Sequence, residues 1–164
     1  MENINIPSTA SPLYKTLRAT AIEFVHSSDQ IYDSNGRMDE TRVKKIRSEQ
    51  GFEHSFGHNH LVSTKPMLAG TRDAEGFIQH MGKMQPYLQS WETTITDVVI
   101  DETRKIAVVR ASYNMLVQGS SEAVENDILW FLSMEESGEK VKKSMEFVDG
   151  AASQKIGEMI RGLM

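Results

Sequence analysis

The stretch of sequence that first suggests chemistry is GFEHSFGHNH, which holds three of the chain's five histidines. On a continuous strand His54, His58 and His60 would all point to one side. An H-x-H pair binds metal when a carboxylate follows it, but no Asp or Glu occurs between His60 and Asp73. The pattern favours a polar loop at the rim of a site over a proton-transfer role for one imidazole, and either over a metal centre. We predict no bound metal.

Two carboxylates lie in apolar strand patterns, Glu146 in MEFVD and Asp127 in ENDILWFL. Strand alternation places Glu146 opposite to Met145 and Phe147, and it places Asp127 on the same side as Leu129. If the Asp127 side faces a cavity, the two carboxylates can meet across neighbouring antiparallel strands as an acid/base pair. The alternatives are that Glu146 is an exposed strand residue paired with a lysine and that Asp127 bonds to a turn.

The cation best placed to serve such a pair is Arg47, which follows a predicted short helix. Its guanidinium can neutralise one carboxylate or hold a substrate carbonyl or enolate oxygen. The alternative is a surface ion pair with Glu40 or Glu49. The chain also has ten methionines, a high number. Plain core packing is the favoured interpretation of them, and a flexible lining for a bulky apolar ligand is the alternative.

The elements that must position these residues follow from hydrophobic periodicity. Helical spacing predicts helices over 13–30, 40–48 and 73–88, with a further short helix after Gly150. Period-two patterns predict four strands, over 91–101, 106–117, 124–134 and 140–149. The stretch 49–70 has no regular period and predicts a short strand and loop, and Asn35-Gly36 predicts a turn.

Short turns between consecutive strands predict an antiparallel meander, because parallel strands need long crossovers. Helices followed by a meander predict an α+β domain whose sheet curls against the long first helix. We expect residues 1–12 to form a loose arm and residues 13–164 to form a single domain.

Composition removes several classes of function. The chain has no cysteine, which excludes disulfides, thiolate-ligated metal and a cysteine nucleophile. A net charge of −5 with scattered basic residues argues against nucleic-acid binding. No apolar run is long enough to cross a membrane, and the N-terminus lacks a secretory pattern, so we predict a cytoplasmic protein. Phosphate-binding glycine loops, G-x-S-x-G and H-E-x-x-H are absent, and no nucleotide, flavin or other cofactor is predicted.

Several short motifs, taken with the element order, carry a resemblance to a known family. They are TAIEFV (20–25), Arg47 after the second helix, VVIDETRKIAVVRAS (98–112), END (125–127) and MEFVDGAAS (145–153). Together they resemble the NTF2-like superfamily of cone-shaped α+β barrels, and within it the small SnoaL-like proteins of fungal secondary-metabolite clusters. Those proteins include cofactor-free isomerases of meroterpenoid pathways and a semipinacolase of indole-alkaloid biosynthesis.

The resemblance implies a hydrophobic cavity at the open end of the cone, with a few inward polar groups. It implies acid/base and anion-stabilising roles for Glu146 and Arg47, and it places Asp127 at the acidic position of the family's NEY motif. The tyrosine of that motif is absent here, and Tyr113 or Trp130 can compensate for it. The residues expected to contact substrate are His54, Phe56, Met67, Met84, Tyr113 and Trp130.

The predicted function is a cofactor-independent isomerase or cyclase that acts by acid/base catalysis on an apolar polycyclic secondary-metabolite intermediate. Glu146 and Asp127 are expected to be the acid/base pair, with Arg47 as an electrostatic clamp. His58 or His60 is expected to carry protons. We expect a homodimer formed through the outer face of the sheet. A dehydratase using the same cone and a non-catalytic ligand-binding or dimerisation module are the alternatives.

Overall fold

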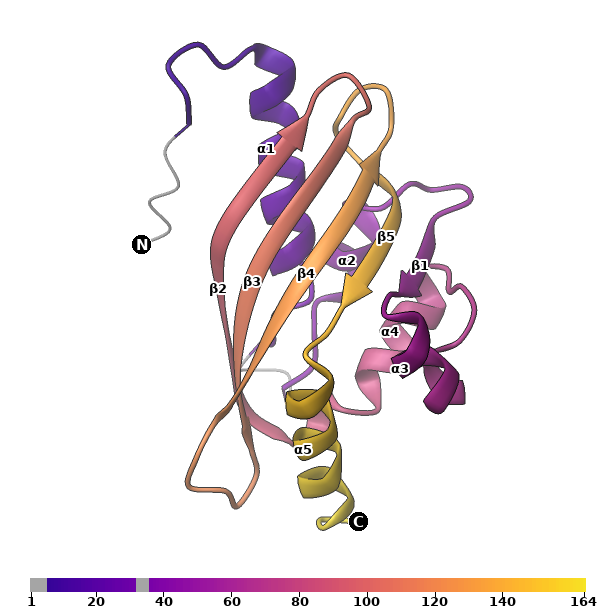
Figure 1. The fold of residues 1–164 in the computed structure, drawn as a ribbon, viewed down its shortest axis with the longest axis vertical. Coiled ribbons are helices and arrows are strands. Elements are labelled where there is room, and N and C mark those ends of the chain that lie inside the picture. The colour runs from indigo at the N-terminus through magenta and orange to yellow at the C-terminus, as the bar shows by residue number, and fades with distance from the viewer. Residues whose placement is uncertain (1–5, 32–35) are drawn as a thin grey trace.

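A curved sheet wraps around a long N-terminal helix in the computed structural model, which describes residues 6–31 and 36–164 (Figure 1). The strands are β1 (Glu53–Phe56), β2 (Leu88–Asp101), β3 (Ile106–Val117), β4 (Val124–Met134) and β5 (Val141–Phe147). The helices are α1 (Pro12–His26), α2 (Glu40–Lys45), α3 (Asn59–Thr64), α4 (Ala74–Gly82) and α5 (Gly150–Arg161), with 3₁₀ helices η2 (Pro66–Leu68) and η3 (Gln85–Tyr87). The α+β class is confirmed.

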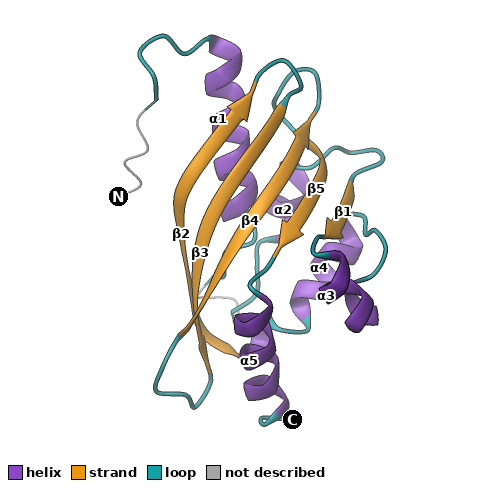
Figure 2. Ribbon diagram, viewed as in Figure 1, coloured by secondary structure: helices purple, strands orange, loops and turns teal. Residues whose placement is uncertain are grey.

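The sheet has the order β1-β5-β4-β3-β2 and is not closed into a barrel (Figure 2). Strands β2 to β5 pair with their neighbours in antiparallel register, which confirms the predicted meander. The short β1 adds to the edge of β5 in parallel, with Phe56 opposite Glu146. A parallel neighbour is possible here because the chain between β1 and β5 is long enough to cross over.

One face of the sheet packs on α1 and forms the core. On β3 and β4 the buried side chains alternate with more exposed ones, as expected for a sheet covered on one side. Tyr113, Ile128 and Trp130 lie on the buried face, whereas Leu129 and Phe131 lie on the outer face. From α1 the core receives Leu17, Ala21, Phe24 and Val25. The predicted packing of the sheet on the first helix is confirmed.

The helices predicted over 13–30, 40–48 and 73–88 are all shorter than their hydrophobic patterns suggest. The last of them ends at Gly82, before η3 and the start of β2. Helix α1 ends at His26 because the hydroxyls of Ser27 and Ser28 donate to the carbonyls of Phe24 and Val25, which favours a turn. Helix α2 ends at Lys45 because the next residues pair with the start of β5. Tertiary hydrogen bonding outweighs helical spacing in that segment.

The segment before α4 also differs from the prediction. The short strand is confirmed as β1, but the rest of the predicted loop contains α3 and η2. The strand ends at Phe56, and His58 takes a left-handed backbone conformation (φ 60°) at the start of α3. The first residue of the predicted turn at Asn35-Gly36 lies outside the described residues.

Helix α1 begins at Pro12, one residue earlier than predicted, with Ser11 as its cap. The Ser11 hydroxyl accepts a hydrogen bond from the Tyr14 backbone N–H (2.9 Å) and donates to Glu102. The division into an N-terminal arm and one domain stays a prediction. Within residues 6–31 and 36–164, no helix is both long and apolar enough to span a bilayer.

Candidate functional site

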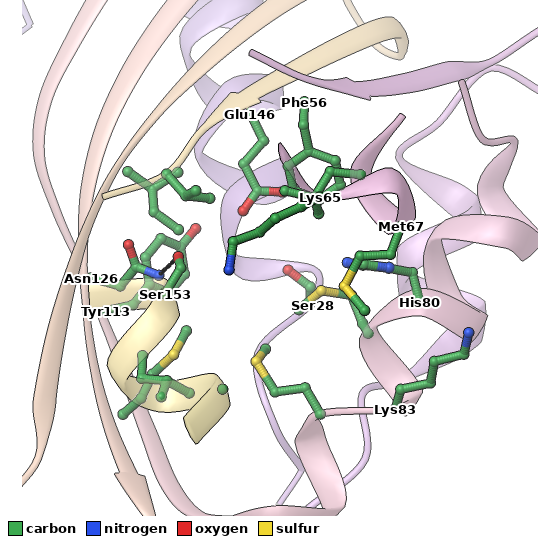
Figure 3. A pocket seen from close by; sticks show the side chains of 18 of the residues that line it. Ser28, Phe56, Lys65, Met67, His80, Lys83, Tyr113, Asn126, Glu146 and Ser153 are labelled. Carbon is green, nitrogen blue, oxygen red and sulfur yellow. Dashed lines mark hydrogen bonds between the residues drawn. The ribbon is translucent and has the colours of Figure 1, made fainter. Parts of the chain in front are cut away.

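A cavity of about 500 Å³ opens between the inner face of the sheet and the helices at one end of it (Figure 3). Side chains from β3, β4 and β5 form one wall, α5 closes one side, and α4 with the α3–η2 segment forms the opposite wall. Most of the lining is apolar. Its large apolar members include Phe56, Met84, Trp91, Met115, Trp130 and Ile156. The volume is typical of a site for a small organic molecule.

Glu146 is the only carboxylate that lines this cavity within the described residues, and its side chain points into it (Figure 3). The residue is only 7% exposed. Its Oε2 lies 3.5 Å from Nε2 of His54, a fully buried residue of β1. Neither of these two atoms has a hydrogen-bond partner among the described residues. The carboxylate is therefore held in an apolar environment with unused hydrogen-bonding capacity, as suits a proton-transferring group.

Contacts on the side of the ring away from Glu146 fix the orientation of His54. Its Nδ1 lies 2.8 Å from the Ser144 hydroxyl, and its ring packs edge-on against Phe56 and Phe77. The parallel pairing of β1 with β5 places His54 opposite Ser144, which brings its ring beside Glu146. With the ring fixed in this way, Nε2 is the nitrogen left to share a proton with the carboxylate.

Tyr113 supplies a phenol on the same wall of the cavity. Its hydroxyl oxygen accepts a hydrogen bond from Nε1 of Trp130 (2.8 Å). Burial, and then the negative charge of Glu146, raise the pKa of the Tyr113 phenol well above its usual range. The phenol therefore stays protonated near neutral pH, and its O–H can donate to a bound oxygen atom.

Asn126 joins the sheet to α5 at the back of the cavity. Its amide nitrogen donates to the Ser153 hydroxyl (3.1 Å), and its amide oxygen accepts from the backbone N–H of Asp149 (3.1 Å). The Asp149 carboxylate in turn caps α5 by accepting from Ala151 and Ala152. These bonds fix α5 as a wall of the cavity.

The rim opposite the sheet carries basic side chains, of which Lys65 points into the cavity (Figure 3). Arg72 lies over the Phe56 ring, with 5.4 Å between its Cζ and the ring centroid. His80 also lines the rim, 5.4 Å from the same ring. Burial, and then the neighbouring charges led by that of Arg72, lower the pKa of His80 to about 4. His80 is therefore a neutral imidazole near pH 7.

Most of the residues predicted to contact substrate line this cavity. They are Phe56, Met67, Met84, Tyr113 and Trp130. The sixth, His54, lies behind Glu146 and is not part of the lining. Met67 lies on the rim and is 70% exposed, so the methionines serve both as wall and as edge rather than only as core.

The expectation that Asp127 faces Glu146 is wrong. Glu146 pairs in register with Trp130, on the inner face, whereas Asp127 lies on the outer face with Leu129. There its carboxylate accepts hydrogen bonds from Nε and Nη2 of Arg110 (3.0 and 2.5 Å), which hold the pKa of Asp127 below its usual value. The inner face of β4 is the one that carries Trp130, because those side chains are the larger apolar set and pack on α1.

Arg47 is not in the cavity lining, and it does not form a surface ion pair either. Its side chain is fully buried, with Cζ 4.3 Å from the Phe24 ring centroid and 4.6 Å from that of Phe77. Nη1 donates to the Val43 carbonyl (2.7 Å) and the Ser27 hydroxyl (3.2 Å). Burial lowers the pKa of Arg47 to about 9. Aromatic faces surround this cation.

His58 and His60 are both exposed and do not line the cavity. The His58 ring packs edge-on against Phe147, with 5.2 Å between centroids, on the outer side of β5. The prediction that the three histidines point to one side of a strand was wrong, because the strand ends before these residues. In the described part of the chain, no three His, Asp or Glu side chains converge as metal ligands. The absence of metal stays a prediction.

Sequence reasoning missed the rim residues Lys65, Arg72 and His80, and also Asn126. His80 was detectable, because it lies three residues after the core residue Phe77 on the same helix and so borders its apolar face. Lys65 and Arg72 flank an irregular segment without period. No sequence signal places them at a cavity.

The element order, the sheet and the position of the cavity define an NTF2-like fold, and solved structures share it. Three fungal proteins are similar over most of their length. The BvnE pinacolase of Penicillium brevicompactum matches with a TM-score of 0.73 and 12% identity, over 92% of this chain and 98% of its own. PrhC of Penicillium brasilianum matches with 0.72 and 18%, over 92% and 91%. AusH of Aspergillus nidulans matches with 0.66 and 17%, over 85% and 87%.

Bacterial structures with the same fold include a putative SnoaL-like polyketide cyclase from Jannaschia, with a TM-score of 0.66 and 14% identity over 91% of this chain and 96% of its own. No family model matches the chain, and no curated protein matches it in sequence. At these identities the similarity establishes the fold alone.

Proposed function

We propose that this protein is a cofactor-independent isomerase or cyclase that acts by acid/base catalysis on a largely apolar polycyclic metabolite. The observation that carries the proposal is the Glu146 carboxylate, which points into an apolar cavity and has an unpartnered oxygen 3.5 Å from His54. A carboxylate in such a position can take a proton from a bound substrate directly, without an intervening water shell.

The proposed step is a proton transfer within one substrate molecule. Glu146 takes a proton from a carbon next to a carbonyl group, and the electron pair of the C–H bond moves to the carbonyl oxygen as an enolate. The Tyr113 O–H donates a hydrogen bond to that oxygen, where negative charge develops. Glu146 then returns the proton to a different carbon, so the product has the mass of the substrate. His54 positions Glu146 and shares its proton between the two transfers.

Known proteins of this fold support the reaction class. Their names include a pinacolase and a putative polyketide cyclase, both of which denote rearrangement or ring closure. An epoxide hydrolase from M. tuberculosis has the same fold (TM-score 0.56, 11% identity), and its name denotes a reaction that adds water. A dehydratase, which would instead remove water, is the second candidate, and product mass separates it from an isomerase.

The outer face of the sheet supports the proposed homodimer. It exposes four large apolar side chains from three strands, namely Val99, Leu129, Phe131 and Met145. Exposed apolar side chains gathered on a sheet are typical of a surface that another molecule covers. A second copy would bury the same set twice in an isologous interface. Sedimentation of wild type and of Phe131→Lys tests this proposal, because only the variant should be monomeric.

The test of the function uses extract from a strain that lacks this gene, incubated with purified protein after chelator treatment and analysed by chromatography with mass detection. We expect a new peak of unchanged mass with the wild type and none with Glu146→Gln. Glu92→Gln, which removes an exposed strand carboxylate, is the matched control and should be fully active. A product lighter by one water would favour the dehydratase. Full activity of Glu146→Gln with an intact fold would remove Glu146 from the mechanism.

A further inference from the structure

The ionisable groups around the cavity have a charge opposite to that of the whole chain. The protein carries a net charge of −5, yet the cavity lining, among the residues that the structure describes, contains four basic residues and one carboxylate, Glu146. The basic residues are Lys65, Arg72, Lys83 and Arg161. His80 adds no charge near pH 7, because its pKa is lowered to about 4. The described part of the lining therefore has a positive rim and one acidic group at its inner end.

Several cations elsewhere on the surface have carboxylate partners. Lys44, Arg110 and Lys140, for example, form ion pairs with carboxylates. Within residues 6–31 and 36–164, neither Lys65 nor Arg72 lies within ion-pair distance of a carboxylate. Two basic side chains without counter-charges beside an apolar cavity form an attractive site for an anion.

The backbone of Arg72 is held in place, and one nitrogen of its guanidinium is unpaired among the described residues. Its backbone pairs with His54 through two hydrogen bonds (2.7 and 2.8 Å), so the edge of β1 fixes its position. In its guanidinium, Nη2 donates to the Met67 carbonyl, and Cζ lies over the Phe56 ring. Nη1 is buried and has no hydrogen-bond partner among the described residues. A buried unpaired donor is costly, and a small turn of the guanidinium toward the cavity would let a ligand oxygen satisfy it.

Lys65 lies before η2, whereas Arg72 lies after it, and Lys65 also lines the cavity. Its side chain crosses the cavity opening and its ammonium group points inward (Figure 3). A planar guanidinium and a mobile ammonium together match a carboxylate, which accepts directed hydrogen bonds from the first and the charge of the second.

We propose that the ligand of this cavity carries a carboxylate group, which binds at the rim to Arg72 and Lys65 while its apolar body extends inward toward Glu146. This inference rests on the proposed function, which assigns the reaction to the end of the ligand that lies near Glu146. It narrows the substrate class to apolar organic acids. It also gives the orientation of the bound ligand. Its acidic group lies away from Glu146, because two carboxylates would repel each other.

The test measures binding of two probes that differ only at one end, 1-pyrenebutyrate and 1-pyrenebutanol. The chain has two tryptophans, and both Trp91 and Trp130 line the cavity, so quenching of their emission by pyrene reports occupancy. We expect wild type to bind the acid about tenfold or more tightly than the alcohol, as for a hydrogen bond to a charged group. The preference should decrease as salt is raised.

Substitutions locate the source of the preference. Lys65→Gln and Arg72→Gln should each reduce it several-fold while leaving the affinity for the alcohol unchanged. Lys142→Gln removes the same charge from an exposed strand position outside the cavity and should retain the full preference. If Arg72→Gln fails to fold, Lys65→Gln decides, because the Lys65 side chain has no hydrogen bond or ion pair with the described residues that would have to be replaced. Equal affinity of wild type for the two probes, or a preference unchanged in Lys65→Gln, would overturn the proposal.

The outcomes separate this proposal from the proposed function. Glu146→Gln should bind pyrenebutyrate at least as well as wild type, because it removes a negative charge from the cavity. Loss of the acid preference in wild type would leave the catalytic role of Glu146 untouched. Failure of both probes to quench either tryptophan would contradict the cavity as a ligand site, and with it the proposed function.

Discussion

Gly57 occupies the point where the strand that holds His54 ends against β5. Its backbone N–H donates to the carbonyl of Glu146 (2.7 Å), so it helps to hold the strand that carries the carboxylate. A Cβ at this position would lie 2.1 Å from Cε1 and 2.3 Å from Cδ1 of Phe147. Carbon atoms in contact prefer about 3.5–4.0 Å, so the Gly57→Ala change requires the ring to withdraw by roughly 1.5 Å.

The cost of that movement can be bounded. Forcing an added methyl into an occupied space costs about 1–3 kcal/mol. Phe147 is only half-buried, and its ring can move outward once it gives up its contact with His58. Replacing glycine also restricts the unfolded chain, which offsets about 0.4–1 kcal/mol because Gly57 does not have a positive φ. We expect a net loss of about 1–2 kcal/mol in the free energy of unfolding, or a fall in Tm of about 2–8 °C.

Urea unfolding of Gly57→Ala, Phe147→Leu and the double variant measures this loss. Because the shorter side chain removes the clashing ring, the double variant should be more stable than the sum of the single changes predicts, by about 1 kcal/mol. The control is Gly82→Ala, where nothing lies within 4 Å of an added Cβ and the helix favours alanine. An unaffected Gly57→Ala, or single effects that add, would refute the steric argument.

Three further predictions concern groups whose ionisation or hydrogen bonding is set by burial. Because the pKa of Arg47 in the folded protein is about 9, below its value of 12.5 in water, the cost of burying its charge is full below pH 9 and is relieved above it. Unfolding at pH 8 and pH 10 should therefore show wild type gaining stability relative to Arg47→Met at the higher pH, and a constant difference would contradict this. The pKa of His80 is lowered to about 4, so stability present above pH 6.5 should be lost as the pH falls toward 4, and His80→Gln should remove that part of the acid sensitivity in melting scans. Tyr113→Phe leaves the Trp130 N–H without its acceptor and should cost about 1–2 kcal/mol in urea unfolding. If the proposed function holds, the same variant should lower kcat about 10²-fold, and unchanged turnover would exclude the phenol as an oxyanion donor.

Much of the fold could be read from periodicity because the sheet is covered on one face only. The alternation of buried and exposed residues in β3 and β4 follows directly from that burial. The short turns between strands allow only antiparallel neighbours. The predicted element boundaries were less accurate where tertiary contacts compete with local conformational preference, as at the end of α1 and in α3. There, serine hydroxyls and a left-handed His58 decide where an element begins or ends.

The sequence by itself determined the class of fold, the meander and the placement of Glu146 opposite to Met145 and Phe147, because these depend on chain-local alternation. It could not decide which face of β4 is inward. Asp127 and Trp130 belong to opposite faces, and only packing against α1 selects one of them. Tertiary structure alone also joined His54 to Glu146, since a parallel pairing between strands about ninety residues apart in sequence sets their distance. The same holds for Lys65 and Arg72, which both line the cavity because β1 fixes one end of an aperiodic segment whose position no local pattern encodes.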